Sequence, residues 1–122
     1  MGTDNPLLEK TISFAIKIVN CFQYLQNEKK EFVMSKQLLR SGTSIGANAH
    51  EAIYGQSRAD FVNKLNISLK EASETSYWIV ILNRTGYFDD SIFKSLKKDL
   101  DEIIRIIIAS IKTTRKNEKY IS

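Results

Sequence analysis

The chain has 122 residues, 43% of them hydrophobic, which is enough for one domain with a substantial core. A single proline and five glycines exclude a turn-rich β fold. The net charge of +4 at pH 7 gives only weak support for an acidic partner. No signal pattern opens the chain, and no apolar run approaches the roughly 20 residues that cross a bilayer, so we expect a cytoplasmic protein without a membrane partner.

The first expected helix spans residues 6–26. Asn5 followed by Pro6 is the pattern of an N-cap side chain and a proline at the first helical position. Apolar residues then recur with helical spacing until the charged stretch "QNEKKE". The only cysteine falls among them, so we expect it to be a buried, reduced thiol. The apolar residues form two neighbouring stripes: Leu8, Ile12, Ala15, Val19 and Phe22 in one, and Phe14, Ile18, Cys21 and Leu25 in the other.

The second expected helix spans residues 34–54 and has an unusual composition. Its stretch "LLRSGTSIGANAHEA" carries glycines and small hydroxyl residues where a core helix would carry leucines. Each glycine inside a helix costs about 0.8–1 kcal/mol relative to alanine. Gly42 and Gly46 lie beside the core stripe, where small residues allow a neighbouring helix to approach closely and offset that cost. The core stripe comprises Leu38, Ile45, Ala49 and Ala52.

The third and fourth expected helices span residues 58–85 and 90–115. Ser57 is a suitable N-cap for the third helix, which stops at the pair Thr85-Gly86. The fourth helix is rich in isoleucine, and the residues after 115 are expected to fray. Four long helices with short connections predict an all-α fold, an antiparallel up-down-up-down four-helix bundle that forms one domain over residues 1–122.

The expected helices carry more apolar residues than a single bundle needs. The isoleucines between Ile103 and Ile111 spread over about 200° of the fourth helix, whereas a bundle helix needs an apolar arc of roughly 100°. A generous core with ordinary exposed apolar residues would explain the surplus. We favour a second buried contact, which predicts a homo-oligomer. The candidate interface residues are Gly42, Gly46, Ile67, Trp78, Leu82, Ile106 and Ile108.

A polar flank of the second helix is expected to face the third helix. Because a short turn near residue 56 joins the two helices, Arg40 and Ser41 should lie level with Glu71. A carboxylate among apolar neighbours needs a partner, so we predict an ion pair between Arg40 and Glu71. A solvated Glu71 is the alternative.

The sequence lacks the motifs of catalysis and cofactor binding. A di-iron site in a four-helix bundle requires inward glutamates and a Glu-x-x-His pair on each of two helices. His50 is the only histidine, Glu51 follows it directly, and no Glu-x-x-His occurs. Nucleotide-binding loops, nucleophile elbows and zinc spacings are also missing. We therefore expect no catalytic, cofactor or metal site and no enzymatic activity; acid/base chemistry at Glu71 and Glu74 is a less favoured alternative.

Two long stretches resemble a known family. "SKQLLRSGTSIGANAHEA" and "DFVNKLNISLKEASETSYWIVIL" are similar to the 23S rRNA intervening-sequence proteins, a four-helix-bundle family related to the accessory variability proteins of diversity-generating retroelements. The resemblance implies a bacterial, cytoplasmic homopentamer, arranged as a ring around a central pore, without established catalysis. It also implies association with structured RNA or, in the retroelement branch, with a reverse transcriptase and nucleic acid. The polar positions that match the family motif are Arg40, Ser41, Ser44, Asn48, Glu51, Glu71 and Glu74.

Cations recur at intervals of about seven residues on the fourth helix. A seven-residue repeat drifts only about 20° per step, so these cations form a ridge opposite the isoleucine arc. This cationic ridge, the candidate nucleic-acid-binding site, comprises Lys94, Lys98, Arg105, Lys112, Lys116 and Lys119. A solvated outer face, interrupted by Asp101, is the alternative. The favoured function is an oligomeric protein that binds RNA or other nucleic acid, or scaffolds a ribonucleoprotein, through phosphate contacts; a protein-interaction adaptor is the second hypothesis.

Overall fold

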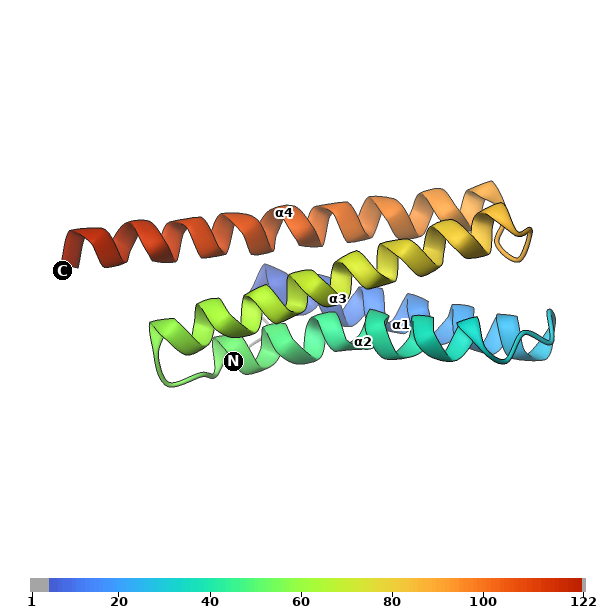
Figure 1. Ribbon diagram of the computed structural model, residues 1–122, viewed down its shortest axis with the longest axis horizontal. Helices are drawn as coiled ribbons and strands as arrows, with labels where there is room; N and C mark the ends of the chain where they lie inside the picture. Colours follow the sequence, from blue (N-terminus) through green and yellow to red (C-terminus); the bar gives the residue numbers. More distant parts are fainter. Residues whose placement is uncertain (1–4, 122) are drawn as a thin grey trace.

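A computed structural model describes the backbone of residues 5–121 and the side chains of residues 5–117. It contains four helices, α1 (Pro6–Asn27), α2 (Met34–Ile53), α3 (Arg58–Arg84) and α4 (Asp90–Ile121). The helices lie side by side in an elongated bundle (Figure 1), and residues 5–121 contain no strand. The prediction of an all-α, four-helix fold is confirmed. α4 continues as a helix beyond residue 115, where the sequence suggested fraying, and the side chain of Lys119 lies outside the described residues.

Side chains cap the starts of α1 and α3 as the sequence predicts. The carboxamide oxygen of Asn5 accepts hydrogen bonds from the backbone N–H groups of Leu7 and Leu8, at 2.9 and 3.4 Å. The hydroxyl of Ser57 accepts one from the N–H of Asp60 at 3.0 Å. Each cap satisfies donors that have no partner inside their own helix. The two helix starts are therefore encoded locally.

The start of α2 is capped by a residue that the sequence analysis missed. The buried carboxylate of Glu31 accepts hydrogen bonds from the N–H groups of Val33, Met34 and Ser35, at 3.2, 3.1 and 2.7 Å. Burial raises the pKa of the Glu31 carboxyl, but the donors outweigh it and the net pKa is lowered. Glu31 thus replaces the usual short N-cap side chain.

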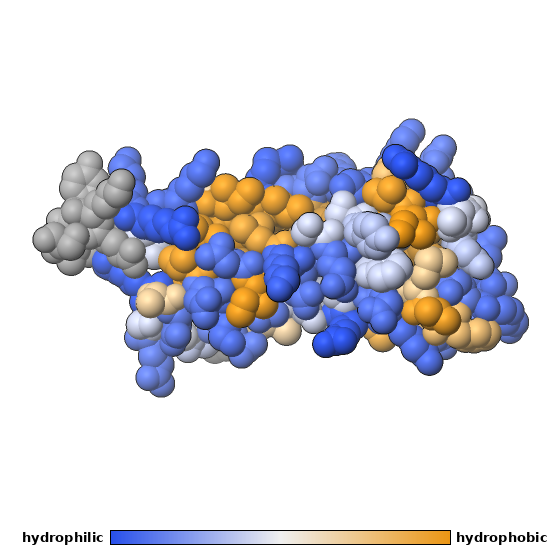
Figure 2. All heavy atoms as spheres, in the orientation of Figure 1, coloured by the Kyte–Doolittle hydropathy of each residue, from blue (hydrophilic) through white to orange (hydrophobic). Residues whose placement is uncertain are grey.

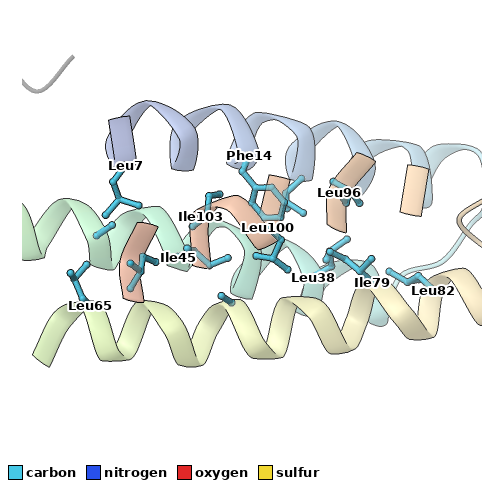
Figure 3. Packing of buried hydrophobic residues seen from close by; sticks show 14 of the residues in the cluster. Leu7, Phe14, Leu38, Ile45, Leu65, Ile79, Leu82, Leu96, Leu100 and Ile103 are labelled. Atoms are coloured by element: carbon cyan, nitrogen blue, oxygen red, sulfur yellow. The ribbon is translucent and has the colours of Figure 1, made fainter. Parts of the chain in front are cut away.

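All four helices contribute to a single apolar core (Figure 3). The isoleucine-rich part of α4 supplies Ile103, Ile107 and Ile111, which are 5% exposed or less. Each helix packs against two neighbours, so that α4 contacts both α3 and α1. The labelled side chains in Figure 3 that meet in this core are Leu7, Phe14, Leu38, Ile45, Leu65, Ile79, Leu82, Leu96, Leu100 and Ile103.

One of the two predicted apolar stripes of α1 faces the core, and the other does so only in part. In the first of these, Phe14 and Ile18 are at most 1% exposed. In the other, Leu8 is buried, whereas Ile12 is 52% exposed; Ile16, which belongs to neither stripe, is 57% exposed. The core lies on the Phe14 face, and Ile12 and Ile16 lie further around the helix, where their side chains stay more than half exposed. α1 therefore presents exposed apolar surface that the sequence analysis placed mainly on the third and fourth helices.

The glycines of α2 face α1 of the same chain, which corrects their assignment to an interface between subunits. A Cβ atom on Gly42 would lie 2.8 Å from Cγ1 of Ile18, and one on Gly46 would lie 3.0 Å from Cβ of Thr11. A side chain at Gly42 would therefore collide with Ile18, and one at Gly46 would crowd Thr11. Leu82 is also wrong as an interface candidate, because it is fully buried within the chain.

Hydrogen bonds between α2 and α3 give a register close to the predicted one, with a shift of at most one helical turn near Ser41. The hydroxyl of Ser68 donates to the carbonyl of Ile45 at 2.7 Å, as the predicted register requires. The hydroxyl of Thr75 donates to the Oγ of Ser41 at 3.0 Å, so Ser41 lies nearer the level of Thr75 than that of Glu71. Among the described residues, Glu71 forms no ion pair with Arg40, whose side chain is exposed. The predicted ion pair is absent because the two side chains are offset along the helices.

Candidate nucleic-acid interface

The cationic ridge lies on the face of α4 that points away from the core. Lys94, Lys98, Arg105, Lys112 and Lys116 are all exposed. The opposite face carries Leu100, Ile103 and Ile107, which are at most 1% exposed. Figure 2 shows hydrophilic side chains along the upper edge of the molecule, which α4 occupies in Figure 1, above an apolar area. The ridge is therefore accessible to a large partner.

Most carboxylates beside the ridge are engaged by other cations. Asp99 pairs with Lys17 of α1, and Glu102 pairs with Lys10 at 3.0 Å. The hydrogen bond and charge of Lys10 hold the pKa of the Glu102 carboxyl below its usual value. Asp101 lies 3.9 Å from Lys97.

The ridge cations themselves have no such partners. Within residues 5–117, Lys94, Lys98, Arg105, Lys112 and Lys116 form no ion pair of 4 Å or less. Their charges are thus not offset by direct intramolecular contacts, and they are positioned to attract phosphate.

The polar residues of the family-like motif lie along the contact between α2 and α3, but they do not form one connected network. The hydroxyl of Ser44 donates to the carbonyl of Arg40, and the carboxamide of Asn48 donates to the carbonyl of Ser44, both within α2. Glu51 pairs with Lys64 at 3.4 Å. Glu71 is half-buried and Glu74 is exposed. Ser44 and Asn48 therefore stabilise α2 locally, Glu51 links α2 to α3, and the described contacts include no paired carboxylates for acid/base chemistry.

The polar contacts that cross this interface include two residues that sequence reasoning missed. The buried hydroxyl of Ser68 donates to the carbonyl of Ile45 at 2.7 Å, and buried Thr75 donates to Ser41. Both lie four or seven residues from core positions of α3, so the helical spacing of these hydroxyl residues could have predicted that they face the core. Their role is to join α2 and α3.

Groups that could support other chemistry are isolated. Burial raises the pKa of the Cys21 thiol to about 11, despite the opposing charge of Lys17, so the thiol is protonated at neutral pH. His50 is exposed and contacts only the Tyr54 ring among aromatic side chains, with ring centroids 4.7 Å apart. The described residues contain no cluster of potential metal ligands. Between Asn5 and Ile121, no helix has the length and apolarity needed to span a membrane.

The remaining interface candidates lie at or near the surface of the single chain. Ile67 and Ile108 are 37% and 39% exposed. Ile106 and Trp78 are half-buried, and the indole N–H of Trp78 is covered without a hydrogen-bond partner among the described residues. These positions, unlike Gly42, are accessible to a second chain.

Comparison with known families gives a clear assignment. The model of the family described as 23S rRNA-intervening sequence protein matches residues 3–109. The chain belongs to this family. A crystal structure of a protein of unknown function from the S23 ribosomal protein family of Bacteroides thetaiotaomicron is 56% identical and superposes with a TM-score of 0.87. The match covers 89% of this chain and 97% of the Bacteroides chain. No curated protein matches the chain.

Proposed function

We propose that the protein is a non-enzymatic, oligomeric nucleic-acid-binding protein of the bacterial cytoplasm that binds structured RNA through the cationic ridge. The observation that carries this proposal is the row of exposed ridge cations without intramolecular ion pairs within the described residues. Lysines and arginines on a rigid helix bind phosphates without reading base sequence. Membership of the 23S rRNA-intervening sequence family is consistent with an RNA partner.

The oligomer in this proposal is a homopentameric ring, and exposed apolar side chains support association. Ile12 and Ile16 of α1 are more than half exposed, and Val19 is 38% exposed on the same side of the helix. Between α1 and α2, Ile12 also borders a groove with Leu8 and Ala15. Burial of this surface against a second chain would remove apolar area from water. A ring of five antiparallel bundles would also multiply the number of phosphate contacts.

The test compares RNA binding by the parent protein with that of the variant K98E/R105E/K112E. We expect the parent to bind a structured RNA with an affinity that falls steeply with salt, and the variant to lose binding while its assembly, measured by light scattering, is unchanged. The matched control K29E/K36E/K70E reverses exposed cations on other elements and should keep most of the affinity. Unchanged binding by the ridge variant would contradict the assignment of the site.

A second candidate function is that of an adaptor that docks on a protein such as a reverse transcriptase. The specific observation in its favour is the exposed apolar side of α1, because such surfaces also mark protein contacts. Absence of RNA binding by the parent at low salt, together with loss of partner binding in I12D/I16D, would favour the adaptor.

A further inference from the structure

The charge on α4 is distributed unevenly between two segments. The near segment, residues 90–102, contains three lysines and four acidic residues. The distal segment, residues 103–117, contains four cations and no acidic residue. The cations of the distal segment are Arg105, Lys112, Arg115 and Lys116, and all four are exposed.

The contacts of the two segments follow the same division. In the near segment, Asp99 and Glu102 form ion pairs with lysines of α1, and Lys97 lies beside Asp101. In the distal segment, no cation forms an ion pair with a described residue. Phosphates approaching the near segment therefore meet carboxylates as well as lysines, whereas residues 103–117 of the distal segment offer cations and no carboxylate of their own.

The position of the distal segment adds a further cation and improves its access. A hollow at this end of the bundle is lined by Arg58 of α3 together with Thr114 and Asn117 of α4. Figure 1 shows the last turns of α4 projecting past the connection between α2 and α3. The family model matches residues 3–109, and Lys112, Arg115 and Lys116 follow the matched range.

We propose that the distal segment is the principal phosphate-binding element of this protein and that its ligand is the backbone of a nucleic-acid duplex. This inference rests on the proposed function and assigns it to one half of the ridge. From Arg105 to Lys116 the helix rises about 16 Å at about 1.5 Å per residue, which matches several consecutive phosphates.

A duplex is the expected form of the ligand because of the side chains that accompany the cations. Proteins that bind single strands combine cations with aromatic side chains on which bases stack. Residues 103–117 contain no aromatic residue. Phe61 of α3 lines the hollow beside Thr114, but the helix segment that carries the four cations has no aromatic side chain of its own. Such a row of cations can bind the backbone of a paired helix independently of its sequence.

The experiment compares two matched charge reversals on the same helix, K112E/K116E in the distal segment and K94E/K98E in the near segment. Binding is measured by fluorescence anisotropy with a 20-base-pair RNA duplex, a DNA duplex of equal length and a single-stranded RNA of 20 nucleotides. We expect the distal variant to bind the RNA duplex at least tenfold more weakly, with a salt slope lower by about 2, and the near variant, which also removes two ridge cations, to lose affinity by a clearly smaller factor.

The possible results distinguish a failure of the distal assignment from a failure of the proposed function. Equal losses in the two variants, or a larger loss in K94E/K98E, would overturn the distal assignment but leave nucleic-acid binding intact. Tighter binding of the single strand than of either duplex would overturn the duplex assignment. No binding by the parent protein at low salt would overturn both proposals. Circular dichroism and light scattering establish that the variants fold and assemble, and K112R/K116R should bind like the parent because it keeps both charges.

Discussion

α2 and α4 both supply core residues, but they pack against their neighbours by different means. α2 approaches α1 through Gly42 and Gly46, where an added side chain would collide with Ile18 or crowd Thr11. Buried hydroxyls of Ser68 and Thr75 join it to α3. α4 instead fills the core with large aliphatic side chains, and its polar links to α1 are ion pairs with partly exposed side chains. The sequence of α2 is therefore constrained by the distance between backbones, and that of α4 by side-chain volume.

The largest expected effect comes from adding volume where α2 meets α1. Gly42→Leu would place its Cβ 2.8 Å from Ile18, a residue with no exposed surface that has no room to move. Overpacking of this kind costs about 3 kcal/mol, which is a large part of the stability of a small domain. Urea denaturation followed by circular dichroism measures the loss.

Two control variants test whether the cost of added volume is specific to the contact between α2 and α1. Ala47→Leu adds similar volume on the exposed side of α2, and Ala109→Leu adds it on the exposed side of α4. We expect both to change the free energy of unfolding by less than about 0.5 kcal/mol. If Gly42→Leu were as stable as these controls, close approach of α1 would not constrain α2.

An intermediate effect is expected at the start of α2. Glu31→Gln removes a buried carboxylate that accepts three backbone N–H groups, and we expect a loss of about 1.5 kcal/mol at pH 7. The folded-state pKa of Glu31 is lowered, so the stabilisation is fully present above the unfolded value of 4.5 and disappears as the pH falls through the folded pKa. Thermal unfolding from pH 7 to pH 3 should show the parent and variant converging in acid.

The cap at the start of α4 provides a control for the cap at the start of α2. Asp89 accepts a single hydrogen bond from the N–H of Ile92, at 2.8 Å and in contact with solvent. Asp89→Asn keeps an oxygen acceptor in place and should cost less than about 0.5 kcal/mol. A difference between the Glu31 and Asp89 variants that persisted unchanged at pH 3 would show that the carboxylate charge is not the source of the stabilisation.

Local features of the fold were predictable from the sequence, whereas relations between helices were less so. Asn5 and Ser57 cap the helices that follow them, because a cap depends only on residues two or three positions away. Glu31 escaped prediction because its long side chain reaches α2 only through the conformation of the connection. The contact of Ser41 with Thr75 depends on the geometry of the turn near residue 56 and on the packing of α2 against α3, which the sequence pattern does not give to within a turn.

The candidate site, too, was predictable where it depends on one helix and not where it depends on how helices pack together. Exposure of the ridge follows from helical periodicity alone, since Arg105 and Lys112 lie opposite Ile107 on one helix. Which α1 stripe is buried depends on how α1 is rotated against its neighbours, and both stripes satisfy the period equally well. The exposure of Ile12 and Val19, which share one stripe, therefore follows only from the packing of α1.

The smallest expected effect lies in the ion pair between α1 and α4. Lys17 and Asp99 have side chains that are 44% and 31% exposed, so water and salt screen their attraction. We expect the coupling energy of a double-mutant cycle with Lys17→Ala and Asp99→Asn to stay below about 0.5 kcal/mol and to vanish in 1 M salt. Because apolar volume holds α4 in place, loss of this pair should leave the bundle intact. A coupling above about 1.5 kcal/mol would instead mean that α4, like α2, depends on polar links to its neighbours.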